Sequence, residues 1–157
     1  MPVEIERKFL VRDKHFLNEA HKSVVIKQGF LNSDKNRVVR VRTSDDSGYL
    51  TIKGISDASG LKRMEWEYEI PRAEAEALLA ICEPTIIEKT RYYIRNGSLE
   101  FEVDVFEKEN EGLMVAEIEL PDENTAFTKP HWLGKEVTGE VKYYNASLSK
   151  HPFNSWA

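Results

Sequence analysis

The chain has 157 residues, a length typical of one domain, and a formal net charge of −5. That charge argues against a surface for long nucleic acid, which needs basic patches to displace counterions. The single cysteine, Cys82, excludes an intrachain disulfide and fits a reducing compartment. Because there is no signal-like N-terminus and no apolar run of about 18 residues, we expect a cytoplasmic protein that does not cross a membrane.

Strand patterns dominate the chain. Alternation and many β-branched or aromatic residues predict strands at 3–11, 24–31, 37–43, 49–54, 63–70, 86–95, 99–106 and 113–120. Asn96-Gly97 predicts a tight hairpin turn, and helices are predicted at 13–22, 71–82 and 144–150. Eight strands joined mostly by short turns predict an α+β protein. Its centre would be an eight-stranded antiparallel β-barrel, or a strongly curved sheet, with a few flanking helices.

Charged residues occupy alternate positions on nearly every predicted strand. In RMEWEYEI, Arg63, Glu65, Glu67 and Glu69 share one face, and apolar residues take the other. The signs also segregate by strand. Like-charged residues two apart form the pairs Glu4 and Glu6, Arg40 and Arg42, Lys89 and Arg91, Glu102 and Asp104, and Glu117 and Glu119. Like charges on one face reduce stability unless opposite charge lies between them.

Two arrangements satisfy this charge pattern. The charged faces could be the solvent side of a sandwich, with salt bridges between neighbouring strands. Alternatively, they could line the inside of a closed barrel, with Ile5 and Phe9 pointing outward beneath the helices. Carboxylates inside such a barrel suit hard divalent cations, and Arg and Lys suit phosphate oxygens. A lumen with both would fit a complex of a metal ion and a polyphosphate.

The ordered motifs of the chain resemble those of one family. EIERK at residues 4–8 matches the ExExK signature of the CYTH superfamily, also called triphosphate tunnel metalloenzymes. It is followed in order by RVR, TIK, RMEWE, EKTR, EVD and EIE, and the segment EVTGEVKYYNASLS is similar to the C-terminal end of the family. The resemblance implies an eight-stranded tunnel that acts on triphosphorylated substrates with a divalent metal ion.

The resemblance also implies roles for individual residues. Those expected to bind the triphosphate are Lys8, Arg40, Arg42, Lys53, Arg63, Lys89 and Arg91. Those expected to hold metal are Glu4, Glu6, Glu102, Asp104, Glu117 and Glu119. Glu65, Glu67, Glu102 and Asp104 would complete the acidic wall, orient basic side chains or help to bind metal. Lys8, Glu4 and Glu6 are the expected catalytic residues, and the family's tyrosine in a QGYL-like stretch is Phe30 here.

The function implied by the resemblance is hydrolysis of a triphosphate with Mg²⁺ or Mn²⁺. Short bacterial members favour inorganic tripolyphosphate, cleaved to pyrophosphate and phosphate, with residues 1–157 acting as one tunnel domain. Three alternatives remain open: a class IV adenylyl cyclase, a thiamine triphosphatase and a non-catalytic polyphosphate-binding module. The expected partner is a small triphosphorylated molecule. A homodimer is also compatible with a barrel whose outer faces are apolar.

The remaining chemically reactive side chains are expected to have structural roles. His15, His21, His131 and His151 are scattered through the sequence without metal-ligand spacing, so we expect surface or packing positions for them. Cys82 follows an apolar helical segment and is expected to be a small core residue.

Overall fold

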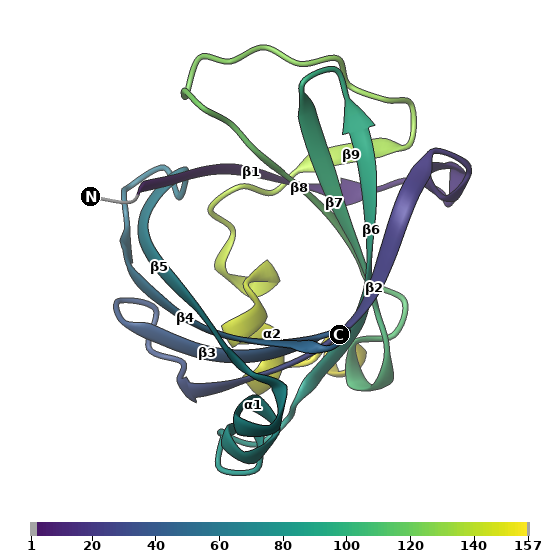
Figure 1. Ribbon diagram of the computed structural model, residues 1–157. Coiled ribbons are helices and arrows are strands. Elements are labelled where there is room, and N and C mark those ends of the chain that lie inside the picture. Colours follow the sequence, from purple (N-terminus) through teal and green to yellow (C-terminus); the bar gives the residue numbers. More distant parts are fainter. Residues whose placement is uncertain (1–2, 157) are drawn as a thin grey trace.

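The fold is a closed β-barrel, seen in a computed structural model that describes residues 3–156 (Figure 1). Its strands are β1 (Val3–Val11), β2 (Ala20–Asn32), β3 (Val38–Ser44), β4 (Ser47–Ser56), β5 (Lys62–Pro71), β6 (Ile87–Asn96), β7 (Leu99–Phe106), β8 (Met114–Glu119) and β9 (Leu133–Glu136). The helices are α1 (Arg72–Leu79), α2 (Asn145–Lys150) and the 3₁₀ helices η1 (His15–Asn18), η2 (Lys108–Asn110), η3 (Val141–Tyr143) and η4 (Phe153–Ser155).

Eight of these strands close the barrel. The hydrogen-bonded order is β5-β4-β3-β2-β6-β7-β8-β1, all pairs are antiparallel, and β1 pairs with β5 to complete the ring. The predicted eight-stranded barrel is therefore confirmed. The short β9 adds to β1 outside the ring and was not predicted.

The strand alternation divides the apolar residues between two cores. One core lies on the outside of β1, β6, β7 and β8, where Phe9, Phe101 and Ile118 pack against Phe16 and Trp132. The other core is formed where Phe30, Val38 and Ile87 meet the C-terminal segment at Tyr143 and Leu148. In Figure 1, α2 is seen within the outline of the barrel, so this second core closes one end of the lumen.

The cover over the outer face differs from the prediction. Phe9 does point outward, but helices contribute little above it. Its ring meets Phe127 edge-on at a centroid distance of 6.0 Å, and Trp132 and Leu133 complete the cluster. Segment 120–133, with η1, is therefore the main cover of this wall, and α1 packs instead beside β3 and β4.

The predicted helices are confirmed in part. The prediction at 13–22 is wrong beyond η1, because β2 begins at Ala20 and pairs with β6 as far as Ile94. Pairing with β6 stabilises a strand in this segment more than its weak helical pattern favours a helix. Helix α1 ends at Leu79, which is earlier than predicted, and α2 agrees closely with the predicted 144–150. Within residues 3–156, no helix is long and apolar enough to cross a membrane.

Candidate functional site

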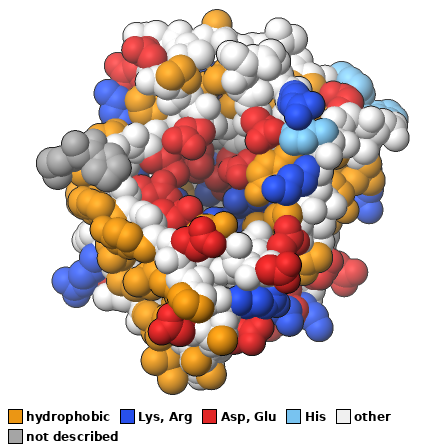
Figure 2. All heavy atoms as spheres, in the orientation of Figure 1, with side chains coloured by type: hydrophobic (Ala, Val, Ile, Leu, Met, Phe, Trp, Pro, Cys, Tyr) orange, Lys and Arg blue, Asp and Glu red, His pale blue; other side chains and the backbone are white. Residues whose placement is uncertain are grey.

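Many of the charged residues of the strands line the inside of the barrel, whereas others, such as Arg7, lie outside the lumen. Two adjoining cavities of about 320 and about 310 Å³ fill the lumen, and six residues belong to both: Glu4, Glu6, Arg40, Lys53, Arg91 and Glu117. Figure 2 shows carboxylate side chains around a central hollow, with basic side chains visible deeper inside. Of the two arrangements that the sequence allowed, the inward-facing one is therefore present.

A basic wall is formed by β3 and β6, which flank β2. Arg40 and Arg91 are 8% and 7% exposed, and Arg42 is also largely covered. Burial, reinforced by the charges of Arg40 and Arg91, lowers the pKa of Arg42 to about 10. Among the described residues, the buried Nε atoms of Arg40 and Arg42 have no hydrogen-bond partner. Unpaired buried donors are costly, so this wall is suited to an oxygen-rich anion.

Asp104 holds two members of the basic wall in place. Its Oδ1 and Oδ2 accept hydrogen bonds from Nε and Nη2 of Arg91 at 2.8 and 2.9 Å. Oδ2 also lies 2.7 Å from Nζ of Lys89, which is fully buried. Burial lowers the pKa of Lys89 to about 8, against the opposing attraction of Asp104. The pKa of Asp104 is itself lowered, because Arg91 and Lys89 outweigh the effect of its burial.

An acidic wall lies opposite, on β1, β7 and β8. The strand register places Glu6 across from Glu119, and Glu102 across from Glu117. Burial and the charges of Glu117 and Glu4 raise the pKa of Glu6 well above its ordinary value. Burial, with the charges of Glu4 and Glu102, likewise raises the pKa of Glu119. Glu102 pairs with Arg91 at 3.3 Å and Glu117 lies 3.8 Å from Lys8, whereas Glu6 and Glu119 form no ion pair within the described residues. Four carboxylates that share so few basic partners are suited to binding a cation.

A third group of charged side chains in the lumen consists of Glu4, Lys53 and Glu65. Nζ of Lys53 lies 3.3 Å from Oε1 of Glu4 and 3.9 Å from Oε1 of Glu65. Burial and a hydrogen bond with Glu4 raise the pKa of Glu65 to about 8. Burial opposes the ionisation of Glu4, but Lys53 and Glu65 hold its pKa below the ordinary value. Glu4 is therefore the charged member of the carboxyl pair.

Lys8 lies where the acidic wall meets the C-terminal segment. Its Nζ is 3.8 Å from Oε1 of Glu117, 3.4 Å from the carbonyl oxygen of Tyr143 and 4.9 Å from the ring centroid of Tyr144. Although burial opposes it, the charge of Lys8 lowers the pKa of Glu117. Lys8 is 8% exposed and also lines the larger cavity, so one face of its ammonium group remains available to a ligand.

The remaining predicted residues also lie in or beside the lumen. Arg63 donates to the carbonyl oxygens of Gly54 and Lys35 at 3.0 and 3.2 Å, and it lines the larger cavity. Glu67 accepts from the hydroxyl of Thr51 at 3.1 Å and lines the smaller one. Phe30 is 3% exposed and belongs to the apolar core at the closed end, where it lines the larger cavity.

Two polar features of the structure were not predicted from the sequence. Gln28 is fully buried opposite Arg42, and neither atom of its amide has a hydrogen-bond partner in the part of the chain that the structure describes. The only indication of this feature in the sequence was the presence of a polar residue at an inward-facing position of β2. The histidines were expected to be scattered, but Nε2 of His131 lies 3.2 Å from Nδ1 of His15.

Comparisons with known proteins agree with this geometry. A family model described as the CYTH domain matches residues 2–152. An inorganic triphosphatase of Acetivibrio thermocellus is 48% identical over 157 residues, 99% of each chain. One of Nitrosomonas europaea is 36% identical over 151 residues, 93% of this chain and 96% of that protein. The crystal structure of the inorganic triphosphatase NE1496 superposes with a TM-score of 0.67 at 32% identity, covering 95% of both chains. The chain therefore belongs to the CYTH domain family.

Proposed function

We propose that this protein is an enzyme that hydrolyses inorganic triphosphate inside the barrel. The observation that carries the proposal is a lumen with two walls of opposite sign, in which the buried Nε donors of Arg40 and Arg42 have no partner among residues 3–156. Full-length similarity to two proteins named inorganic triphosphatase supports the substrate. A linear triphosphate has the charge and the oxygen atoms that such a basic wall binds.

In this proposal the basic side chains bind and align the substrate. Arg40, Arg42 and Arg91 provide guanidinium groups that can each pair with two phosphate oxygens. Lys53 on the neighbouring strand β4 and Lys8 on β1 provide point charges. Lys89 and Arg63 have supporting roles. Lys89 pairs with Asp104 behind the basic wall, and Arg63 lies over the ring of Tyr144 in the C-terminal segment. Phosphoryl transfer depends mainly on positioning and charge stabilisation, which this arrangement supplies.

The acidic wall fits a divalent cation, and we propose Mg²⁺ or Mn²⁺. Glu6 and Glu119 face each other, as do Glu102 and Glu117, and like charges directly opposite one another are unfavourable without a cation. Carboxylate oxygens are the ligands that hard cations prefer. Together with Glu4, these residues would hold the metal, which supplies charge neutralisation and a more acidic bound water. The acidic wall also offers carboxylates that can accept the proton released by the attacking water.

For Asp104 the sequence suggested two roles, metal binding or the orientation of basic side chains, and we propose the second. It was expected among the metal ligands, but Arg91 and Lys89 occupy both of its oxygens. We therefore assign it to positioning these two basic side chains. We assign a similar positioning role to Glu65 and Glu67. Glu65 lies next to Lys53, and Glu67 contacts Thr51 and the arginines of β3.

One parallel assay tests the proposal. Purified protein with Mg²⁺ or Mn²⁺ is offered tripolyphosphate, ATP and thiamine triphosphate, and phosphate, pyrophosphate and cyclic AMP are measured. We expect the fastest release of phosphate from tripolyphosphate, with equimolar pyrophosphate as the second product. Cyclic AMP formed from ATP would support a cyclase instead, and fastest turnover of thiamine triphosphate would support a thiamine triphosphatase. Tight binding of tripolyphosphate without turnover would identify a binding module.

We also propose that residues 1–157 act as one tunnel domain, since the family match extends over residues 2–152. A cytoplasmic location and a homodimer remain predictions. The single cysteine supports the first. Exposed apolar side chains on the barrel, such as Val25 and Tyr68, support the second. Light scattering of the purified protein would decide the oligomeric state.

A further inference from the structure

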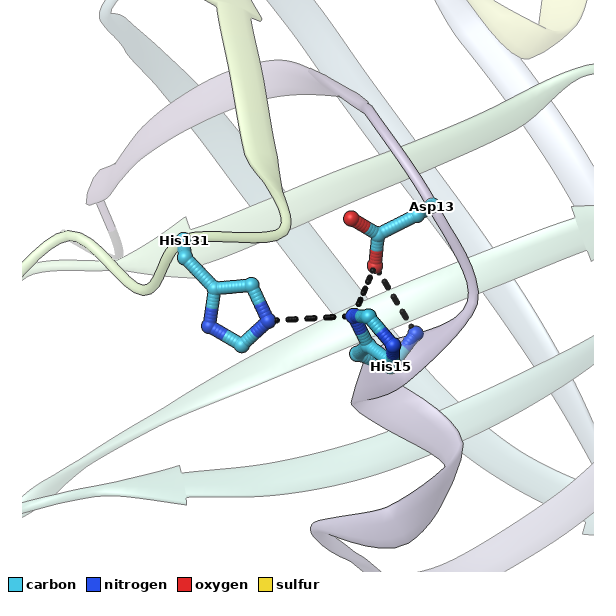
Figure 3. Close-up of side chains that lie close together, drawn as sticks. All are labelled: Asp13, His15 and His131. Carbon is cyan, nitrogen blue, oxygen red and sulfur yellow. Dashed lines mark hydrogen bonds and ion pairs between the residues drawn. The ribbon is translucent and has the colours of Figure 1, made fainter.

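A cluster of metal-ligating side chains lies outside the lumen, on the covered wall of the barrel. Asp13, His15 and His131 turn toward one another in Figure 3, and their ligand atoms all lie within 4.8 Å of each other. His15 is the first residue of η1 and Asp13 precedes it, whereas His131 lies just before β9. None of the three belongs to the residues that line the lumen.

The fold itself brings these distant segments together. The backbone N–H of Arg12 donates to the carbonyl oxygen of Trp132 at 2.8 Å, directly beside the ligand-bearing residues. Each histidine also precedes a fully buried aromatic residue, and the rings of Phe16 and Trp132 pack edge-on at 5.9 Å. The backbone of both segments is thus anchored, although the histidine side chains themselves are exposed.

The Nδ1 atom of His15 has two neighbours and, in the neutral imidazole, can hydrogen-bond to only one of them. Nδ1 of His15 lies 3.1 Å from Oδ1 of Asp13 and 3.2 Å from Nε2 of His131. A neutral imidazole nitrogen either donates or accepts, so it serves one of these neighbours at a time. If it accepts from His131, it has no proton to donate to the Asp13 carboxylate. If it donates to Asp13, it has no lone pair left for His131. A cation between them would let all three atoms act as lone-pair donors.

The distances agree with coordination of one ion. Ligand atoms about 2.0–2.1 Å from a tetrahedral Zn²⁺ lie roughly 3.3 Å from each other, close to the two separations seen here. The carboxylate of Asp13 is oriented by the backbone N–H of His15, which donates to it at 2.9 Å. Such outer contacts of a ligand are typical of metal sites. The third separation, between Asp13 and His131, is at most 4.8 Å, so coordination would require the exposed His131 ring to turn closer to Asp13.

We propose that Asp13, His15 and His131 form a second, peripheral metal site that takes Zn²⁺ or a similar transition-metal ion. Two imidazoles and one carboxylate favour this class of ion over Mg²⁺, which prefers oxygen ligands. Water fills the remaining position, because the site faces solvent. The ion would tie η1 to segment 120–133 and so stabilise the cover over the outer apolar core.

The experiment is a Zn²⁺ titration of chelator-treated protein by calorimetry, carried out in the Glu4→Gln, Glu6→Gln background to weaken binding in the lumen. We expect His131→Ala and His15→Ala each to lose one bound equivalent of Zn²⁺. The matched control is His21→Ala, since His21 is also an exposed histidine and pairs with one carboxylate, that of Glu100. This control should retain the full stoichiometry. Zn²⁺ should also raise the melting temperature of the parent and the control, but not that of His131→Ala.

Nitrogen-15 spectra of the imidazoles locate the ion independently of any variant. On addition of Zn²⁺, the Nδ1 signal of His15 and the Nε2 signal of His131 should shift, and those of His21 should not. Unchanged stoichiometry in both histidine variants, or equal loss in His21→Ala, would overturn the site. Because none of these measurements involves triphosphate turnover, their outcome is independent of the proposed function.

Discussion

Arg91 and Asp104 form a two-point pair inside the barrel, with N–O distances of 2.8 and 2.9 Å, and Lys89 shares the same carboxylate. All three side chains are nearly or fully buried. Charged groups at such depth are stable only while they are paired. The pair therefore keeps the basic wall charged and directed toward the lumen before any ligand enters.

Substitution of Asp104 by Asn should harm both stability and substrate binding. Removing one partner of a buried charge pair costs about 3–5 kcal/mol, because the other charge is left uncompensated. Arg91 would also lose its orientation. KM for tripolyphosphate should rise roughly 10- to 100-fold, in line with about 1.5–3 kcal/mol for a hydrogen bond to a charged group. Denaturant unfolding and initial-rate kinetics measure the two effects. Glu67→Gln is the control for stability, because Glu67 is 38% exposed at its side chain.

An unchanged KM in a folded Asp104→Asn protein would mean that Asp104 does not position Arg91 for substrate. A large fall in kcat at unchanged KM, accompanied by weaker metal binding, would restore Asp104 to the metal ligands.

The double substitution Glu4→Gln with Glu6→Gln should abolish metal-dependent hydrolysis. A metal ion contributes several kcal/mol of charge stabilisation, so the rate should fall by at least about 100-fold. The fold should survive, because Gln has the shape of Glu and removes repulsion from Glu117. Phosphate release measures the first effect and circular dichroism the second. The matched control is Glu74→Gln with Glu76→Gln on the exposed face of α1, which has the same spacing and charge change.

Glu6→Gln alone offers a sharper check of the acidic wall. In the metal-free protein it should raise the melting temperature, since a buried carboxyl group beside Glu117 and Glu4 is replaced by a neutral amide. A lower melting temperature would show that Glu6 is already compensated within the protein.

Gly60→Ala should be markedly more destabilising than Gly97→Ala. Both glycines have positive φ, +77° and +62°, so each alanine costs about 1–2 kcal/mol in backbone strain. A Cβ at Gly60 would also run into the backbone of Gly139, which belongs to a neighbouring loop that lines the same cavity. That clash should add about 1–3 kcal/mol, whereas a Cβ at Gly97 meets nothing. Equal losses in urea unfolding would argue against close contact of the two loops.

The ion pair of Arg7 and Glu136 should make stability depend on pH in the acid range. Hydrogen bonding to Arg7 is the main reason that the pKa of Glu136 lies below its ordinary value of 4.5. The unfolded chain then binds more protons than the folded one, so stability increases with pH in this range. The contribution is complete above the unfolded pKa and is lost as pH falls through the folded pKa.

Glu136→Gln should therefore be less stable than the parent near neutral pH, by less than about 1 kcal/mol for a half-exposed pair. The difference should vanish in strong acid. Urea unfolding across the acid range tests this, with Glu109→Gln on exposed η2 as the control that shows no such trend. A difference that stays constant at every pH would assign the effect to packing instead of charge.

The sequence by itself determined the strands, their alternation and the segregation of charge. These features are local, since side chains two apart on a strand share a face whatever the strand pairs with. Lys8, Arg40 and Glu117 could therefore be predicted on one charged surface. The order of the motifs also indicated the family, and the eight-stranded ring followed from it. Alternation placed Phe9 on the face opposite Lys8, and the interpretation of the charged face as the inside of a barrel then placed Phe9 correctly on the outer side.

Tertiary structure alone decided which charges meet. Register places Lys8 opposite Glu117 and gives Asp104 to Arg91 and Lys89, and no local pattern specifies such pairs. The cover of the outer wall by segment 120–133 and the meeting of His15 with His131 depend on contacts between residues more than 100 positions apart. Such contacts are set by the closure of the barrel and the packing of its loops, because only these bring distant parts of the chain to one place.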